Sequence, residues 1–230
     1  LAGPSQIGKT AVLQQLHNGR LGPDSVPIYV DLAQLAQHTA SIFFWELAQT
    51  ALADFKQKRR LSTQLAQSDF VASPQRALTD QFLQPVMARL DGRRLLLLLD
   101  NVQTLEMNGD DETLAKLFSW LRRQTAVTGI LTLTQENANL TPNWIGILAG
   151  AERFFMEPLQ LDEVTDYLQQ TQPVLLAKAV IQQIYENSGG QPTAVQDICR
   201  FLQTRLTTGR LRQITLADLA MAHKMGVGRF

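Results

Sequence analysis

The sequence has little of what covalent or metal cross-links require. It contains one cysteine, Cys199, so no internal disulfide can form. Its three histidines (His17, His38 and His223) are too scattered for a metal-binding motif. These absences argue against a disulfide-stabilised secreted domain and against a zinc-binding module, and the cytoplasm is the expected compartment.

Long apolar stretches and an excess of one charge are also missing. The longest uninterrupted apolar run, residues 95–99, is far shorter than the roughly 20 residues that span a bilayer, and no signal peptide opens the chain. Twenty-one basic residues balance twenty-one acidic ones, so the overall charge attracts neither nucleic acid nor an anionic membrane. We therefore expect no membrane insertion, and nucleic-acid binding through this chain is disfavoured.

What remains is the composition of a folded domain. The 230 residues are 45% hydrophobic, which is enough to bury a sizeable interior. A chain of this length is near the upper limit for one core, so we expect one α/β domain with a smaller attached subdomain. Because there is no initiator methionine, we also expect a piece of a longer protein, with most of the first strand outside it.

Hydrophobic periodicity predicts alternating strands and helices over the first two thirds of the chain. The expected strands are 27–31, 93–100, 129–134 and 153–156, and the expected helices are 9–18, 41–56, 74–90 and 111–123. Residues 93–100 give the strongest strand signal, since a continuous apolar run ends there in an acid. This order predicts a mostly parallel sheet covered by helices on both faces.

From residue 159 the pattern changes to helices only. We expect helices at 162–170, 174–187, 192–207 and 216–225, the last opened by Thr215 and Asp218 as an approximate capping box. The expected domains are therefore an α/β domain over residues 1–157 and a smaller, all-helical lid subdomain over residues 158–230.

The most specific motif lies near the start of the chain. It consists of Gly3, Pro4, Ser5, Gln6, Ile7, Gly8, Lys9 and Thr10, which match G-x-x-x-x-G-K-[ST] at every fixed position. Such a loop turns successive backbone N–H groups towards phosphate oxygens, and the N-terminus of the following helix adds partial positive charge. We expect Lys9 to bind the β- and γ-phosphates and the Thr10 hydroxyl to ligate magnesium. The alternative is a glycine-rich turn that fits by chance.

A second motif lies at the end of the apolar strand. Asp100 is placed where a carboxylate beside the phosphate loop can hold a magnesium-bound water, although alone it could be a surface acid that ends a strand. Many ATP-hydrolysing P-loop proteins carry a glutamate at the next position to orient the attacking water. Here that position is Asn101, whose amide cannot accept a proton, so slow hydrolysis or none is expected. Glu106 could substitute.

Two further stretches carry weaker signals. Thr132 and Thr134 alternate with leucines and so point to one face of their strand, where Thr134 or Gln135 could sense the γ-phosphate. Strand propensity explains these threonines equally well. Residues 187–192 (NSGGQP) lie between two predicted helices, where glycine can end one helix and Pro192 can start the next.

The combined order of these features resembles that of the STAND signal-transduction ATPases, a branch of the AAA+ group related to archaeal origin-recognition-like ATPases. The resemblance rests on the phosphate loop, the strand ending in Asp100, the tip at Thr134, the opening at 159–164 and the glycine-proline element at 190–192. It covers nearly all of the chain. Two positions depart from it: Asn101 replaces the usual acid, and Gln135 stands where this group often has an arginine.

The resemblance implies a fold, a ligand and a set of roles. Residues 3–10 would bind the phosphates of ATP or ADP, Asp100 would hold Mg²⁺, Thr134 would lie near the γ-phosphate, and Pro192 would reach the nucleotide from the helical lid. Such proteins are ATP-driven switches that assemble when a sensor domain detects its ligand and ATP binds. The implied partners are fused or associated sensor and effector domains and a nucleotide-dependent homo-oligomer.

The leading hypothesis is therefore an ATP/ADP-binding regulatory switch module with slow magnesium-dependent hydrolysis, built as a P-loop NTPase. One alternative is a nucleotide-binding scaffold that never hydrolyses. Another is a P-loop phosphotransferase, for which no acceptor pocket with a base and arginines can be named. A DNA-loading ATPase is opposed by the neutral charge and by the lack of a recognisable winged helix. The lack of an N-K-x-D motif favours ATP over GTP.

Overall fold

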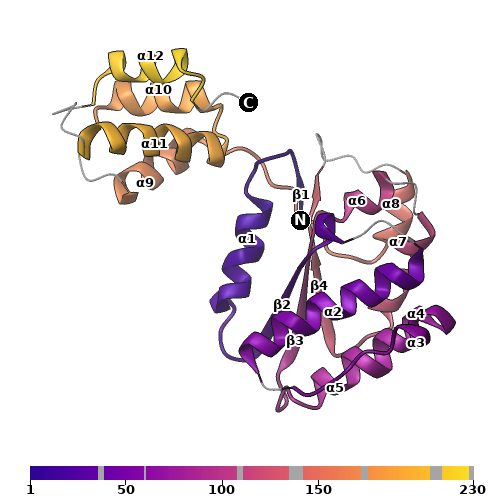
Figure 1. Ribbon diagram of the computed structural model, residues 1–230. Helices are drawn as coiled ribbons and strands as arrows, with labels where there is room; N and C mark the ends of the chain where they lie inside the picture. The colour runs from indigo at the N-terminus through magenta and orange to yellow at the C-terminus, as the bar shows by residue number, and fades with distance from the viewer. Residues whose placement is uncertain are drawn as a thin grey trace. The chain divides into compact units, whose positions relative to one another are not determined.

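The computed structural model describes residues 1–35, 39–59, 61–107, 111–134, 142–171, 176–207 and 214–227. The chain forms two compact units (Figure 1). The first combines Leu1–Gly3 with Lys9–Phe155, and the second combines Pro4–Gly8 with Met156–Phe230. Among the described residues, no helix is both long enough and apolar enough to cross a membrane.

The first unit is built on parallel strands. They are β1 (Ala2–Gly3), β2 (Ser25–Asp31), β3 (Arg94–Asp100), β4 (Val127–Leu131) and β5 (Leu133–Thr134). β3 lies between β2 and β4, β1 pairs with β5, and every pairing is parallel. Because only Thr132 separates β4 from β5, the strands follow the order β2, β3, β4/β5, β1. This confirms the expected parallel sheet of a P-loop NTPase.

Two of the predicted strands differ in the structure. The strand expected at 129–134 is divided at Thr132, whose N–H donates to the Leu99 carbonyl at 3.0 Å and whose own carbonyl accepts from Val102 at 3.1 Å. The strand expected at 153–156 is reduced to one parallel bridge between Ala2 and Phe155. Since β1 contributes only two residues, a longer ladder has no partner there.

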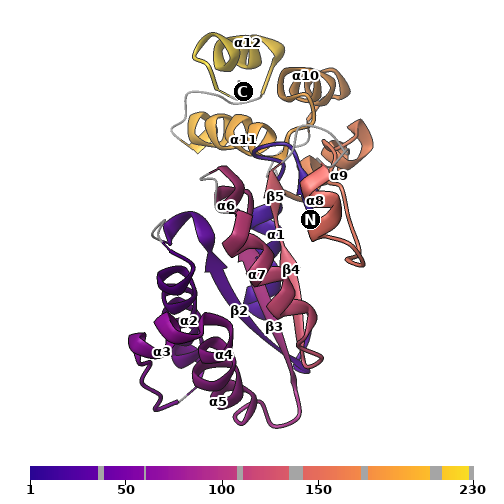
Figure 2. The same ribbon diagram turned by 90° about the vertical axis from the view of Figure 1, so that its right-hand side faces the viewer.

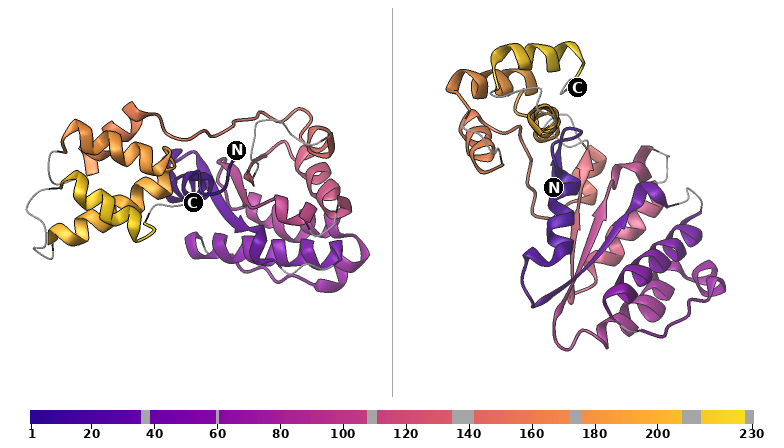
Figure 3. Two further views of the ribbon diagram at one scale, coloured as in Figure 1. Left: turned by 90° about the horizontal axis from the view of Figure 1, so that it is seen from above. Right: turned by 60° about the vertical axis from the view of Figure 1, so that its left-hand side comes forward.

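Helices cover both faces of the sheet, because alternate residues of each central strand point to opposite sides. Leu95, Leu97 and Leu99 belong to the larger core, whereas Leu96 and Leu98 pack with Leu13 of α1 (Lys9–Gln15). Figures 1 and 3 show α1 on one side of the strands and α2 on the other. The helices of the larger core include α2 (Ala40–Lys58), α3 (Gln67–Ala72), α4 (Pro74–Ala77), α6 (Gln103–Met107), α7 (Asp111–Arg122) and α8 (Pro142–Ile147).

The helix predicted over 74–90 begins at Pro74 as expected, but it is not regular. It passes through a π-helical turn at Leu78–Leu83 and ends with α5 (Gln84–Met87). Pro85 has no N–H to continue the i→i−4 ladder, which accounts for the wider turn before it. Ser73, the residue before this helix, makes no side-chain cap, and its carbonyl accepts from the Ala77 N–H at 2.9 Å.

The helical part of the second unit follows the sequence periodicity closely (Figure 2). Its helices are α9 (Leu161–Thr171), α10 (Lys178–Ser188), α11 (Pro192–Thr207) and α12 (Leu216–Lys224), packed around a shared apolar core. The predicted start of the second of these helices, Val174, lies outside the described residues. The capping box is confirmed, since the Asp218 carboxylate accepts from the Thr215 N–H at 2.9 Å.

The two glycines before α11 have different roles. Gly189 ends α10 in a left-handed conformation, with φ 57°, as ordinary capping requires. Gly190, with φ 73°, is also pressed against the chain that enters the bundle: a Cβ there would lie 2.1 Å from the Leu159 carbonyl oxygen. The Leu159 N–H donates to the Gly190 carbonyl at 2.8 Å. Gly190 therefore permits a close backbone approach that any side chain would block.

We expect Gly190→Ala to lower the free energy of unfolding by about 3 kcal/mol, because the methyl group overlaps a backbone atom that must then move. Gly189→Ala is the matched control: it meets open space, so only the left-handed backbone costs, about 1–2 kcal/mol. Urea denaturation followed by circular dichroism measures both. Equal losses would show that backbone conformation alone, and not the approach to Leu159, makes glycine necessary.

Candidate nucleotide-binding site

Asp100, at the carboxyl end of β3, lies at the centre of the candidate site. It is 1% exposed and accepts hydrogen bonds from four donors. The Thr10 hydroxyl lies 2.7 Å and the Tyr29 hydroxyl 2.9 Å from Oδ2. The Asn101 N–H, at 3.1 Å, and the Thr132 hydroxyl donate to Oδ1. Both carboxylate oxygens of Asp100 are therefore held in fixed positions by hydrogen-bond donors from different segments of the first unit.

The bond between Thr10 and Asp100 joins the two sequence motifs. Thr10 follows the loop at the start of α1, and Asp100 lies ninety positions later at the tip of a buried strand. A hydroxyl and a carboxylate are hard oxygen donors, which Mg²⁺ prefers. The structure thus brings together the two side chains predicted to hold the metal.

Lys9 lies beside them at the first position of α1. It is 7% exposed, and its Nζ donates to the Gly3 carbonyl at 2.9 Å. The ammonium group is therefore held over the start of the loop rather than extended into solvent. Within the loop, Gln6 and Gly8 have left-handed φ values of 61° and 97°, the curled geometry that turns backbone N–H groups inward.

The loop also makes a contact inside the second unit. Thr193, in the first turn of α11, donates from its hydroxyl to the Gln6 carbonyl at 3.1 Å. Pro192, predicted to reach the nucleotide, is the residue immediately before it and begins α11. The start of this helix and the phosphate loop are thus joined by a direct hydrogen bond.

A network that the sequence did not reveal surrounds Asn101. Its Nδ2 donates to Oδ1 of Asp31, at the tip of β2, at 2.8 Å. Gln103 connects the same region to Thr134: its Nε2 donates to the Thr134 hydroxyl at 3.2 Å, and its Oε1 accepts from the Thr134 N–H at 3.1 Å. The sequence does contain a signal for Asp31, because this residue, like Asp100, is an acid at the end of a predicted strand.

Tyr29 is the other participant that sequence reasoning missed. Burial, the hydrogen bond to Asp100 and the negative charges of Asp100 and Asp31 all raise the pKa of this phenol. Tyr29 therefore remains protonated and serves as a permanent donor to Asp100. No sequence motif marks it, because a tyrosine in a strand is ordinary.

Glu106, the predicted substitute acid, is engaged elsewhere. The Trp144 indole N–H donates to its Oε2, and Trp144 packs edge-to-face on Phe118 of α7, with ring centroids 6.2 Å apart. Gln135, named with Thr134 as a γ-phosphate sensor, lies outside the described residues. Glu106 therefore does not add an acid to the site around Asp100.

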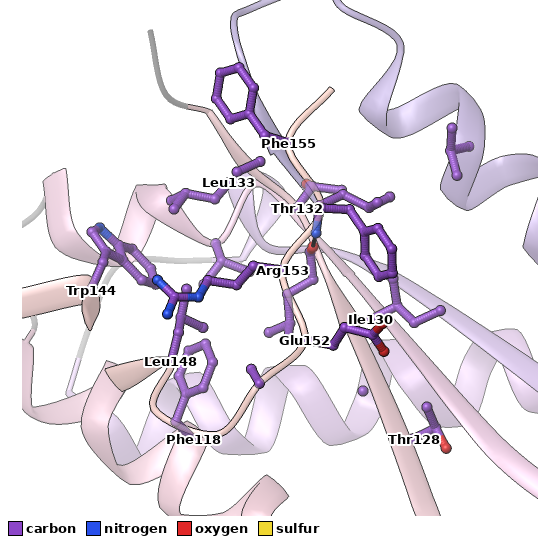
Figure 4. Close-up of a pocket in the computed structure, with 18 of the residues that line it drawn as sticks. Phe118, Thr128, Ile130, Thr132, Leu133, Trp144, Leu148, Glu152, Arg153 and Phe155 are labelled. Atoms are coloured by element: carbon purple, nitrogen blue, oxygen red, sulfur yellow. Dashed lines mark hydrogen bonds between the residues drawn. The ribbon is translucent and has the colours of Figure 1, made fainter. Parts of the chain in front are cut away.

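An apolar cavity of about 700 Å³ also lies in the first unit (Figure 4). It runs between β4 and residues 151–155, with Phe118, Trp144 and Leu148 among its walls. Lys9, Thr10 and Asp100 are not among the residues that line it. Thr132, which donates to Asp100, is the residue of that site that also lines the cavity.

Comparison with known proteins agrees with this geometry. The AAA domain family matches residues 1–140, which is more than half of the chain. The chain belongs to the AAA domain family. It is thus an AAA-type P-loop nucleotide-binding domain, and such domains typically bind their nucleotide with Mg²⁺. Lys9, Thr10 and Asp100 of this AAA domain, the residues that the sequence predicts to bind phosphate and metal, all lie within the matched range.

One solved structure has a similar fold over almost the whole length of this AAA domain. The Orc1 protein of Aeropyrum pernix, solved in complex with DNA, matches with a TM-score of 0.60 at 18% sequence identity. The match covers 97% of this chain and 58% of the Orc1 chain, so this chain spans little more than half the length of that protein. At this identity the likeness shows the fold alone. A search of curated proteins gave no match.

Proposed function

We propose that this AAA domain is an ATP/ADP switch module of the STAND type, with slow magnesium-dependent hydrolysis and a conformational output. The observation that carries the proposal is the 2.7 Å hydrogen bond between Thr10 and Asp100, which brings together the two side chains that we propose bind magnesium. Lys9, held beside it, supplies the charge for the β- and γ-phosphates.

The proposed rate is slow because the residue next to Asp100 is not an acid. The Asn101 side chain donates to Asp31 and offers no carboxylate to the attacking water. A positioned base contributes typically about 10² to 10⁴-fold to such a step. Thr134, held by Gln103 at the tip of β5, is the proposed contact to the γ-phosphate.

The proposed output runs through the helical region. We assign residues 1–157 as the nucleotide-binding domain and residues 158–230 as its lid, with Pro192 contacting the nucleotide. The Thr193–Gln6 hydrogen bond supports this role, since a change in the loop on nucleotide binding would act directly on the start of α11. Sensor and effector domains, and a homo-oligomer formed with ATP, are the proposed partners, and the cytoplasm the proposed compartment.

A turnover experiment tests the proposal. We expect the purified chain to bind ATP and ADP with Mg²⁺ in calorimetry and to release an adenine nucleotide on denaturation. Single-turnover hydrolysis should be roughly 10²-fold or more below the 1–10³ s⁻¹ common among enzymes. Absence of binding would overturn the proposal. Tight binding with no hydrolysis at all would instead support a scaffold that holds nucleotide permanently.

DNA binding is not part of the proposal, although the Orc1 protein was solved with DNA. Nucleic-acid affinity depends on Lys and Arg that neutralise phosphates, and here basic and acidic residues are equal in number. We propose instead that the groups around Asp100 bind one small anionic ligand and one metal ion.

A further inference from the structure

Asp31, the last residue of β2, is a second acid at a strand end near the candidate site. It is the register partner of Asp100 in the parallel pairing of β2 with β3, and neighbouring strands lie about 4.8 Å apart. Tyr29, two residues earlier and so on the same face, packs with Leu13 of α1 and donates to Asp100. Asp31 and Asp100 therefore share the α1 side of the sheet, at its carboxyl edge.

The Asp31 carboxylate is held in place by three donors. The Ala33 N–H, at 3.1 Å, and the Asn101 amide, at 2.8 Å, both donate to Oδ1, and the Gln34 side chain donates to Oδ2 at 2.9 Å. Asn101 can reach across because its backbone is left-handed, with φ 59°, a conformation that asparagine tolerates better than most residues. Asn101 thus orients a carboxylate on the neighbouring strand instead of carrying one.

No other acid in the described sheet is placed in this way. Of the five described strands, only β2 and β3 end in a carboxylate. Asp100 is surrounded by the donors of the magnesium site, and Glu106 is engaged by Trp144. Of the acids at these described strand ends, Asp31 is therefore the candidate to accept a proton from the attacking water.

We infer that the slow hydrolysis proposed above depends on Asp31, which orients the attacking water and accepts its proton from the neighbouring strand, less effectively than an acid at position 101 would. This inference rests on the proposed ATP hydrolysis. The water oxygen forms a bond to the γ-phosphorus while the bond from that phosphorus to the β,γ-bridging oxygen breaks, and its electron pair leaves on ADP. The water's proton passes to the Asp31 carboxylate and then to the released phosphate or to solvent. Asn101 is a positioning residue in this scheme.

Single-turnover hydrolysis by the 230-residue chain, with ATP affinity measured in parallel, tests the inference. Asp31→Asn should slow hydrolysis by roughly 10²-fold or more while ATP affinity changes by less than about threefold. Asn101→Ala, which leaves the carboxylate in place but removes one of its donors, should cost about tenfold or less. Asp24→Asn, an exposed acid just before the opposite end of β2, is the matched control and should leave both quantities unchanged.

A rescue variant guards against a general loss of structure. Asp31→Asn combined with Asn101→Glu returns a carboxylate to the strand tips, and its rate should exceed that of Asp31→Asn alone. Undiminished hydrolysis in Asp31→Asn would overturn the inference and leave the proposed function standing. Equal losses in Asp31→Asn and Asn101→Ala would also overturn it, since Asp31 would then act only through Asn101. A parent chain that fails to bind ATP would overturn the proposed function itself.

Discussion

Lys9→Ala is expected to abolish tight triphosphate binding. Lys9 is 7% exposed, and its ammonium group lies 2.9 Å from the Gly3 carbonyl at the start of the loop, where a nucleotide's phosphates would take over its hydrogen bonds. Each charge-assisted hydrogen bond contributes about 1.5–3 kcal/mol, so the loss of two or more weakens ATP binding by roughly 10²-fold or greater. Isothermal calorimetry with ATP and Mg²⁺ measures this directly.

Two further variants separate charge from packing in that experiment. Lys9→Met keeps most of the aliphatic stem, so it should bind ATP as poorly as Lys9→Ala while melting closer to the parent temperature. Lys178→Ala removes an exposed lysine at the start of α10 and should leave affinity unchanged. If Lys9→Ala binds ATP like the parent, residues 3–10 are an ordinary glycine-rich turn and the phosphate-loop assignment is wrong.

Asp100→Asn should mainly weaken the dependence of ATP binding on magnesium. The substitution keeps the shape of a side chain that is 1% exposed, and the hydroxyls of Thr10 and Tyr29 can rotate to accept from its new amide group. The negative charge that would hold the magnesium-bound water is lost, so the magnesium concentration at half-saturation should rise by about tenfold or more. A magnesium titration at fixed ATP gives this value.

The same variant carries an independent optical signal. Because the Asp100 charge and hydrogen bond raise the pKa of Tyr29, their removal should lower that pKa towards the ordinary tyrosine value, visible as phenolate absorbance at lower pH. Asp91→Asn, which alters an acid whose side chain is 76% exposed, is the control for both readouts. An identical magnesium titration in Asp100→Asn and parent would show that Asp100 only ends a strand.

Apolar patterning predicted the elements that are stabilised by extensive burial. The strand at Arg94–Asp100 begins one residue from its predicted start, and α11 has the predicted bounds of Pro192 and Thr207. The continuous apolar run matches a strand buried on both faces, and the apolar residues of α11 recur at helical spacing, so the pattern and the packing agree in both elements. The G-x-x-x-x-G-K-[ST] pattern likewise led directly to Lys9 and Thr10.

The remaining features depend on partners that a linear pattern does not specify. The strand predicted at 153–156 is reduced to one bridge because its pairing partner, β1, has only two residues. The sequence pattern predicts the acid of such a site directly after Asp100 along the chain, whereas Asp31 lies across the strand pair from it. The sequence around Gly190 indicates only a helix cap. The close approach of Leu159 comes from a segment thirty-one residues earlier, so no local pattern indicates it.

The pairing of β1 with β5 sets the order in which this domain can form. Ala2 pairs with Leu133 and Gly3 with Thr134, so the first strand has no partner until more than 130 residues have followed it. At about 5–20 residues per second, the ribosome takes on the order of ten seconds to supply that partner. Because pairings of long sequence separation form slowly, we expect β2 and β3 to pair before β1 pairs with β5. The segment that leads into the phosphate loop would then join the sheet last, and we expect nascent or truncated chains ending before Leu133 to be unable to bind ATP.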